Sequence, residues 1–577
     1  MTGYNKSASS ARGQARTKRI SHNKNLSTCL YPHIYRSAAH LSCTFTQSHP
    51  KKFITCLLVN GKNLILRPIT MVIYIEYLPD FSQDYGIMFG FEKQFFDYLI
   101  SHPRGNSDNK TTKEIILKRK SFLTVLIALF ILNITLPASL PETQSRKINR
   151  LFQQIDQNPN EYITFLQQLS RATKEGEEAV QKLVADRFKA LGGEVEVLSI
   201  KPATLEFKNE FVADQEVSQV ARISVVGKYT GVKKGPSLLF FAHPDNPPQT
   251  GLDKWIHPAF DAQIEGSKLY GWGVADDLAG VAIMAEAIAA IQRAGLKIGG
   301  DVVLCSTPAK KGAQGVIALL SKGYTADAAV YLHPAESGVG MREIKAIASG
   351  MLKFRITVQG QQPETTEPGK TAFAHLGTNA VHKAMKVIEA LQALDAQRGE
   401  RIHHPRLDKA VGRSTNLLIG YMNAGTPGGY TQIPDECTIG ASLTFPPQEK
   451  MTLIQKEVEE CLRKTAQSDP WLRENPPVIE WLFGTQGVET PVEHPLYQTV
   501  SRAIQTVTQE EPFVNPMHSG SDIRNPYLYS GIPTVGLGPL CGNLAQNGFY
   551  DEWVDVPDFI RAVKITAQII LDWGNQK

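Results

Sequence analysis

Two short stretches of the sequence carry imidazole and acidic side chains in an arrangement that suits metal chemistry. In the first, His243 and Asp245 follow an apolar run at 236–242. A strand that ends at the edge of an open α/β sheet places such residues where ligands usually bind. The imidazole can bind a metal ion through one ring nitrogen, and a nearby carboxylate can orient the ring. Taken alone, a His-x-Asp pattern more often has a structural or turn role than a metal-binding one.

The second stretch is an Asp-Asp pair at the start of a hydrophobic helix. Gly271 and Gly273 allow a tight turn before Asp276 and Asp277. Aspartates at a helix start can act as caps, and Asp277 is placed to cap the helix expected over 277–295. A carboxylate can also bridge two divalent ions through its two oxygens, so Asp276 is a candidate metal ligand.

Five motifs occur along the chain in one order. They are HPD at 243–245, YGWGVADDLAG at 270–280, GSDIR at 520–524, GIPTVGLGP at 531–539 and DEWVDVPDFIRA at 551–562. This set resembles the co-catalytic zinc amidohydrolases of metallopeptidase family twenty, which include acetylornithine deacetylase, succinyl-diaminopimelate desuccinylase, aminoacylases and dipeptidases. The resemblance spans 150–577 and implies an α/β fold: a mixed sheet flanked by helices, with a small inserted α+β lid or dimerisation domain.

The resemblance implies roles for four of these residues. His243 matches a metal-binding histidine, Asp245 the catalytic-site aspartate that supports it, and Asp276 the aspartate that bridges two metal ions. His333 stands where the family has a carboxylate ligand, and histidine also binds zinc. Together they imply a centre for one or two Zn²⁺ ions, with one ion favoured. Such a centre activates water for attack on an amide carbonyl.

Two elements that the family would supply are absent. Where the family has adjacent glutamates, a general base and a ligand, this sequence has Lys310 and Lys311. An ammonium group cannot accept a proton unless its pKa is strongly lowered. The family's last histidine ligand also has no counterpart in LAQNGFYDEWV. The candidates for a base or a further ligand are Glu336, His375, His518 and Asp551.

The predicted substrate-binding residues lie in the inserted domain. The family carries there a histidine before a helix, and an arginine in the last strand that binds the substrate carboxylate. Here His375 precedes a Gly-Thr-Asn-Ala sequence, while the last strand, SLTFPP, has no arginine. Arg413 and Asn416 are the nearest polar replacements. We expect these three side chains to contact the substrate, an N-acyl amino acid or a short peptide.

Strand and helix patterns alternate from residue 145 onward. VVLCSTP and AAVYLHP are short apolar runs that follow helical stretches, which indicates a sheet with crossover helices. Between 349 and 482 the pattern changes to strand, helix, strand, typical of a small α+β domain. We therefore predict a catalytic domain in two parts, 145–348 and 483–577, and an inserted domain at 349–482. Because family members often pair through that domain, helix 379–394 and strand 352–360 are the candidates for a homodimer interface; they could equally pack only inside their own domain.

The chain before residue 145 has a different character. Residues 118–140 combine a Lys-Arg-Lys flank, an uncharged segment and a Pro-Ala-Ser exit, the three parts of a secretory signal. An uncleaved membrane anchor is the alternative, although the segment is short for crossing about 30 Å of hydrocarbon. We expect 1–117 to be disordered or to precede the true start. The protein would then be secreted, periplasmic or envelope-associated, or organellar if the basic first 75 residues are a transit peptide.

Composition and motifs exclude several other classes of function. The first 75 residues contain eleven Lys or Arg and no Asp or Glu, so the formal charge of +5 leaves −6 for the remainder. A mildly acidic domain has no electrostatic basis for binding nucleic acid. The seven cysteines form no Cys-x-x-Cys pair. Nucleophile-elbow, P-loop and dinucleotide-binding motifs are also absent from the sequence.

Two functions follow from these residues. The first is a metal-dependent hydrolase that cleaves an amide bond in an N-acyl amino acid or short peptide. The second is a non-catalytic relative that binds such a molecule, with Lys310 and Lys311 neutralising its carboxylate. Retention of His243, Asp245 and Asp276 favours the enzyme.

Overall fold

The chain divides into two compact units, residues 1–137 and 138–577. The computed structural model describes residues 40–48, 51–59, 69–71, 144–212, 220–244, 251–308, 314–335, 337–516, 520–542 and 550–576. In the first unit three antiparallel strands are described, namely β1 (His40–Ser48), β2 (Lys51–Val59) and β3 (Ile69–Met71). The predicted signal at 118–140 lies outside the described residues. Of the helices that the structure describes, none has the length and apolar character needed to cross a bilayer.

A six-stranded sheet forms the centre of the second unit, in the order β20-β11-β7-β10-β6-β4. Its strands are β4 (Glu194–Ile200), β6 (Arg222–Tyr229), β7 (Leu238–Ala242), β10 (Val302–Ser306), β11 (Ala328–Leu332) and β20 (Thr534–Leu537). The first four strands in the spatial order are parallel, whereas β6 is antiparallel to both of its neighbours, β10 and β4. This mixed α/β sheet confirms the predicted fold class.

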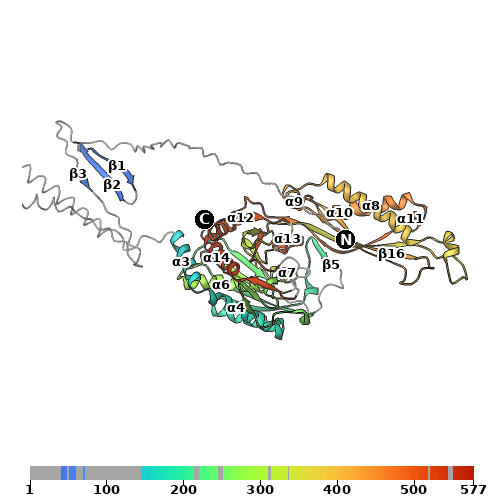
Figure 1. The fold of residues 1–577 in the computed structure, drawn as a ribbon, viewed down its shortest axis with the longest axis horizontal. Coiled ribbons are helices and arrows are strands. Elements are labelled where there is room, and N and C mark those ends of the chain that lie inside the picture. Colours follow the sequence, from blue (N-terminus) through green and yellow to red (C-terminus); the bar gives the residue numbers. More distant parts are fainter. Residues whose placement is uncertain are drawn as a thin grey trace, which may run out of the picture. The chain divides into compact units, whose positions relative to one another are not determined.

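Helices cover both faces of this sheet (Figure 1). Successive side chains of a strand point to opposite faces, so Phe240 of β7 packs in one core and Phe241 in the other. The helices of the first face are α3 (Gln144–Gln157), α4 (Pro159–Ala172), α5 (Glu177–Ala190), α6 (Ala279–Arg293), α12 (Pro495–Thr508) and α14 (Val556–Trp573). Those of the second face are α7 (Gln314–Ser321) and α13 (Arg524–Ser530). Strands buried on both sides explain the continuous apolar runs of the sequence.

The start of α6 differs from its prediction. The expected cap, Asp277, does not cap the helix, because the N-cap position is Leu278 and no side chain bonds there. Residues 274–278 form a separate turn, η5 (Val274–Leu278), that leads into α6 and in which Asp276 and Asp277 have non-helical backbone angles. At the other end, Gly295 has a φ of 65° and ends the helix where the sequence predicted. The Asp277 carboxylate instead accepts a hydrogen bond from the backbone N–H of His243.

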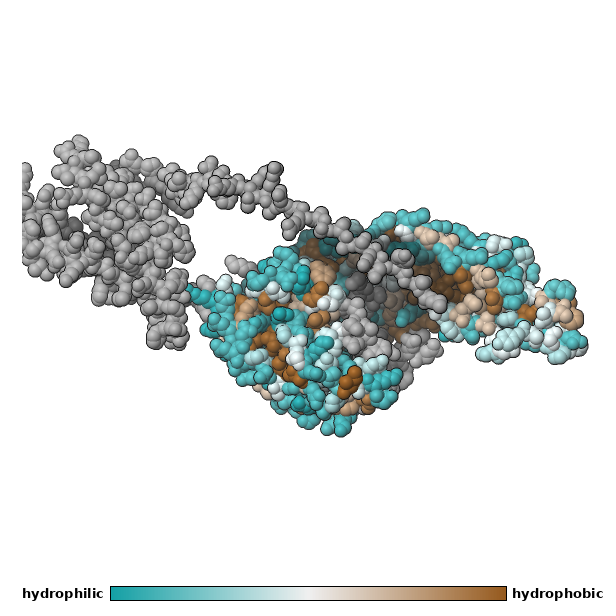
Figure 2. Space-filling model, in the orientation of Figure 1, coloured by the Kyte–Doolittle hydropathy of each residue, from teal (hydrophilic) through white to brown (hydrophobic). Residues whose placement is uncertain are grey.

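A second sheet, of five strands, has the order β15-β16-β14-β17-β5. Its strands are β5 (Glu210–Val212), β14 (Gly350–Gln359), β15 (Asn416–Ala424), β16 (Glu436–Phe445) and β17 (Val478–Thr485). Its helices are α8 (Ala380–Arg401), α9 (Pro405–Val411), α10 (Met451–Ser468) and α11 (Pro470–Glu474). Alternate residues of β14 are buried against α8 and α10, as its alternating sequence predicted. The helices of this sheet present a predominantly hydrophilic surface on the face shown in Figure 2.

Short pairings complete the second unit. β8 (Gln263–Glu265), β9 (Lys268–Tyr270) and β21 (Trp553–Asp555) form a three-stranded sheet. Two further pairs are β12 (Glu343–Ile344) with β19 (Phe513–Val514), and β13 (Ile347–Ala348) with β18 (Val488–Glu489). The β21–β9 pairing places the C-terminal DEW motif next to the turn that contains Asp276.

One glycine sets the distance between α6 and the sheet. A Cβ at Gly280 would overlap the carbonyl oxygen of Leu332 and lie 3.0 Å from the Cβ of Ala242. We expect Gly280→Ala to lower the free energy of unfolding by about 1–3 kcal/mol, because the helix or the strand end must move. Urea denaturation measures the loss.

The matched control is Gly420→Ala in β15, where an added Cβ would meet nothing within 4 Å. Its unfolding free energy should stay within about 0.5 kcal/mol of the wild type. Equal losses in the two variants would show that the close approach of α6 does not limit stability.

Candidate active site

The carboxyl ends of three neighbouring strands bring the first polar groups together. His243 follows β7, Thr307 follows β10 and His333 follows β11. β7 pairs in parallel with both β10 and β11, so the three residues emerge at the same edge of the sheet. All three are buried. The position is the one expected for a ligand site in an open α/β fold.

His243 is held through its backbone and both ring nitrogens. Its Nδ1 lies 2.6 Å from the carbonyl oxygen of Thr307, and its backbone N–H donates to Oδ1 of Asp277 at 3.0 Å. Its Nε2 lies 2.9 Å from Oδ2 of Asp522. A carbonyl oxygen only accepts hydrogen bonds, so Nδ1 carries a proton. The environment of Nε2 therefore suits a positive charge, either the proton of an imidazolium or a bound cation.

Asp276 and His333 form a second pair of imidazole and carboxylate. Nε2 of His333 lies 3.3 Å from Oδ1 of Asp276. The His333 side chain is 3% exposed, whereas that of Asp276 is 17% exposed. The carboxylate is therefore the side of the pair that solvent or a substrate reaches.

Glu552 shapes the turn that carries Asp276. Its carboxylate accepts hydrogen bonds from the backbone N–H groups of Gly273 at 3.0 Å, Ala275 at 2.7 Å and Asp276 at 3.0 Å. The peptide bond between Asp276 and Asp277 is cis. Glu552 is 2% exposed, so these amides satisfy a carboxylate that burial would otherwise destabilise. The DEW motif was recognisable in the sequence, but its glutamate was not predicted to support the turn.

Asp522 is a second site residue that the sequence analysis missed. Its Oδ1 accepts a hydrogen bond from Nη1 of Arg524 at 2.7 Å, while Oδ2 faces His243. Burial alone would lower the pKa of Arg524, but the carboxylates of Glu210 and Asp522 raise that pKa above its ordinary value. The guanidinium therefore stays charged and compensates the buried Asp522. The Asp-x-Arg spacing in GSDIR was the available signal.

Another buried ion pair lies behind His333. Nζ of Lys345 is 3.0 Å from Oε1 of Glu343, and it donates to the carbonyl oxygens of His333 at 3.3 Å and of Pro334. Burial alone would raise the pKa of Glu343, but Lys345 and Ser337 lower that pKa overall. By binding these two carbonyl oxygens, the lysine fixes the main chain at His333 and thereby the position of its imidazole.

The described residues supply donors suited to a divalent metal, but in pairs. Neutral imidazole nitrogen and carboxylate oxygen are ordinary zinc ligands. Within the described ranges, however, no group of three or more His, Cys, Asp or Glu side chains is placed to hold a metal ion. In this structure the two histidines face different carboxylates, His243 that of Asp522 and His333 that of Asp276.

Several predicted residues lie outside the described residues, and their roles stay predictions. Asp245 belongs to the segment 245–250, and Lys310 and Lys311 belong to 309–313. Two candidates for a base, Glu336 and His518, are likewise outside. The other two candidates, His375 and Asp551, are described, and Oδ1 of Asp551 accepts the backbone N–H of Ile256 and of His257, each at 3.0 Å. These bonds give Asp551 a structural role at the surface.

The three predicted substrate-binding residues lie with the second sheet. His375 is exposed in the 3₁₀ turn η8 (Thr371–Leu376), and Asn416 is exposed at the start of β15. Arg413 is half-buried, with Nη1 3.0 Å from Oδ2 of Asp395 on α8. Among the described residues, no hydrogen bond or ion pair joins these three to the strand-end site. Their contact with substrate stays a prediction.

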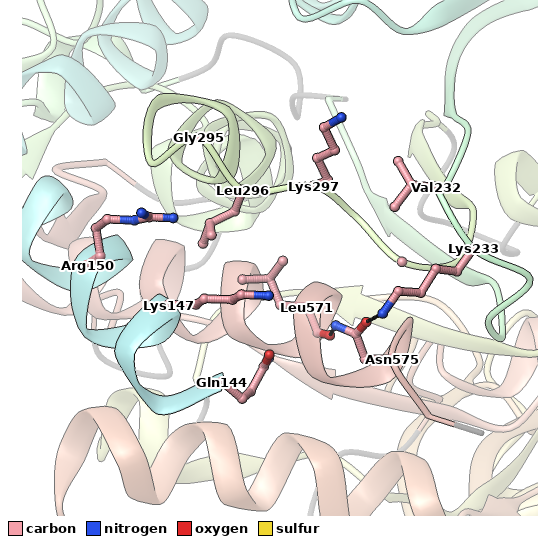
Figure 3. Close-up of a pocket in the computed structure, with 11 residues that line it drawn as sticks. Gln144, Lys147, Arg150, Val232, Lys233, Gly295, Leu296, Lys297, Leu571 and Asn575 are labelled. Carbon is pink, nitrogen blue, oxygen red and sulfur yellow. Dashed lines mark hydrogen bonds between the residues drawn. The ribbon is translucent and has the colours of Figure 1, made fainter. Parts of the chain in front are cut away.

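A separate cavity of about 350 Å³ lies near the ends of α6 and α14 (Figure 3). The cationic side chains in its lining are Lys147, Arg150, Lys233 and Lys297. Nζ of Lys233 donates to Oδ1 of Asn575 at 3.0 Å, just beyond α14. Cations beside the C-terminal ends of helices interact favourably with the helix dipoles. None of the predicted site residues lines this cavity, so it is distinct from the strand-end site.

The three amide contacts of Glu552 lead to a testable expectation. In Glu552→Gln the side-chain NH₂ would face a backbone N–H, and the buried donors would lose charge-assisted bonds. We expect the free energy of unfolding to fall by about 1–3 kcal/mol in urea denaturation. The neighbouring variant Asp551→Asn also weakens bonds from backbone amides, but at the surface, and should cost less. Equal costs would contradict the role assigned to the buried turn.

Solved structures with the same fold include human carnosine dipeptidase 1 and aminopeptidase PepT from Bacillus cereus. The first matches with a TM-score of 0.54 and 15% identity, covering 74% of this chain and 99% of the dipeptidase. The second matches with a TM-score of 0.53 and 20% identity, covering 72% and 97% of the two chains. At these identities the likeness concerns the fold alone.

A curated relative and a family model extend the comparison to sequence. The chain is 25% identical over 370 residues to N-formyl-4-amino-5-aminomethyl-2-methylpyrimidine deformylase from Bacillus subtilis, covering 61% of this chain and 84% of the relative. The model of peptidase family M20/M25/M40 matches residues 239–572, more than half of the chain. The resemblance expected from the five motifs is confirmed, and the chain belongs to peptidase family M20/M25/M40, whose members are metal-dependent hydrolases.

Proposed function

We propose that this protein hydrolyses an amide bond in an N-acyl amino acid, a formylated amine or a short peptide, with Zn²⁺ as its metal. The observation that carries the proposal is the His333–Asp276 pair, 3.3 Å apart, beside His243 at the carboxyl ends of parallel strands. Family membership supports a metal-dependent amide hydrolase in general. One zinc ion per chain is favoured over two, because Lys310 and Lys311 replace the paired glutamates.

Each residue of the site would have a separate role in such a reaction. A bound divalent metal would supply a Lewis acid and lower the pKa of a water molecule. Thr307 fixes the protonated nitrogen of His243, so only Nε2 is available as a ligand. Glu552 holds the turn of Asp276, which keeps the accessible carboxylate in place. Asp245 would orient His243 from the segment that follows β7.

The choice of substrates follows from the relatives. The name of the curated relative describes removal of a formyl group from an aminomethylpyrimidine, while one of the matched structures is a dipeptidase. Both reactions break an amide bond next to a small acyl group or amino acid. We propose that His375, Arg413 and Asn416 select among such substrates.

The proposal extends to assembly and location. β15 is an edge strand of the second sheet, and its Leu418, Tyr421 and Met422 side chains are 63%, 56% and 48% exposed. We propose a homodimer through this domain, with β15 in place of the strand 352–360, because β14 is interior to the sheet. We also propose export through the segment 118–140, which lies outside the described residues.

A second function is supported by one specific observation. Lys310 and Lys311 stand in the sequence where the family has its paired glutamates. A non-catalytic relative that binds a peptide or an acylated amino acid would have this property. Its lysines would neutralise the carboxylate of the bound molecule.

Metal content tests the enzymatic proposal directly. We expect about one zinc per chain by elemental analysis of the purified protein. In Asp276→Ala we expect the zinc affinity to fall roughly 100-fold or more, because the variant loses a direct ligand. The control Asp186→Ala removes only an exposed ion pair with Lys182 and should keep the metal.

Hydrolysis is then measured on a panel of N-acyl amino acids, dipeptides and the formylated aminomethylpyrimidine. Activity that chelation removes and Zn²⁺ restores would support the enzyme. A protein without zinc that binds members of the panel but cleaves none would instead be the non-catalytic relative.

A further inference from the structure

The chain crosses from one sheet to the other and back between residues 200 and 222. β4 and β6 are antiparallel neighbours in the six-stranded sheet, yet β5, which lies between them in sequence, belongs to the five-stranded sheet. There it pairs with β17, with Glu210 opposite Thr485. The backbone N–H of Gln486 also donates to the carbonyl oxygen of Asn209 at 3.1 Å. Glu210 is therefore carried by the second sheet.

The side chain of Glu210 returns to the first sheet. Its Oε1 accepts from Nη2 of Arg524 at 3.0 Å and its Oε2 from Nε at 3.1 Å, a two-pronged contact. Both side chains are almost completely buried, at 2% exposure for Glu210 and 3% for Arg524. A planar guanidinium fixes the orientation of a carboxylate that it binds through two N–H groups.

The same guanidinium holds Asp522 in place. Nη1 of Arg524 donates to Oδ1 of Asp522 at 2.7 Å, and Oδ2 of Asp522 lies 2.9 Å from Nε2 of His243. An unbroken series of contacts thus runs from β5 of the second sheet to the imidazole at the end of β7. Every side chain in it is at least nine-tenths buried, so water does not substitute for any of the bonds.

We propose that Glu210 and Arg524 are positioning residues that tie the orientation of His243 to the position of the second sheet. A buried ion pair often adds little net stability compared with apolar side chains, so its geometric effect is the property to test. Displacing a reacting group by about 1 Å can cost roughly 100-fold in rate. The link would let a substrate bound against the second sheet influence the imidazole. This catalytic consequence rests on the proposed hydrolase, whereas the link itself does not.

The link is tested first without a substrate. The full chain is labelled with ¹⁵N-histidine, and the ring signals of His243 are identified by their loss in His243→Gln. We expect Glu210→Gln to shift the His243 ring signals and to speed exchange of its ring proton with water. The control is Glu286→Gln, which also removes a buried carboxylate, bound to Arg187 at 2.5 and 2.9 Å, away from the strand ends.

His243 signals that stay at their wild-type positions in folded Glu210→Gln would overturn the proposal, as would an equal shift in Glu286→Gln. If Glu210→Gln does not fold, Glu210→Asp takes its place, because the shorter carboxylate keeps the charge but not the two-pronged contact. For Glu210→Asp, too, unshifted His243 signals, or a shift equal to that in Glu286→Gln, would overturn the proposal.

A double-mutant cycle then separates positioning from stability in the active enzyme. We expect Glu210→Gln to lower kcat about 10-fold, the lower end of the effect of residues that support metal ligands. In the Asp522→Asn background Glu210→Gln should lower kcat no further, whereas a general loss of stability would lower kcat in both backgrounds. If the loss in kcat of the double variant equals the product of the losses of the two single variants, the link is contradicted. If no substrate is cleaved, the proposed function fails, and the spectra of the metal-free protein still decide the link.

Discussion

The burial of charged groups at the carboxyl ends of the parallel strands is the constraint on which this structure depends. His243 and His333 stand at the ends of strands that are covered on both faces, so each group near them must find partners within the protein. The carboxylates of Glu552, Asp522 and Glu343 are each met by backbone amides or by a cation. The positions of His243 and His333 therefore depend on the buried groups that surround them.

These supports come from distant parts of the sequence. Glu552 reaches the turn of Asp276 through the pairing of β21 with β9, and Lys345 reaches the main chain of His333 from beyond β11. Neither contact involves the atoms that would bind a substrate. The contacts of Glu552 explain why the C-terminal DEW motif, which contains no histidine, belongs to the same site as His243 and His333.

The sequence was sufficient for the fold and for part of the site. Apolar runs and helical periodicity depend on neighbouring residues, and the strands β7, β10 and β11 and the helix α6 follow from them. Asp277 was wrongly predicted as a helix cap, because a local pattern cannot reveal that its carboxylate binds the backbone of His243. Glu210 and Arg524 were not predicted at all. They are 314 positions apart, and only the folded chain brings them together.

The position of β5 also bears on how the protein is made. β5 leaves the ribosome with the strands of the first sheet, but its partner β17 follows more than two hundred residues later. At a typical rate of about 5–20 residues per second, β5 stays an unpaired edge for roughly ten seconds or more. Throughout that time the carboxylate of Glu210 lacks its later partner Arg524, which is synthesised after β17. Both sheets therefore reach their final form only after nearly the whole chain has been synthesised.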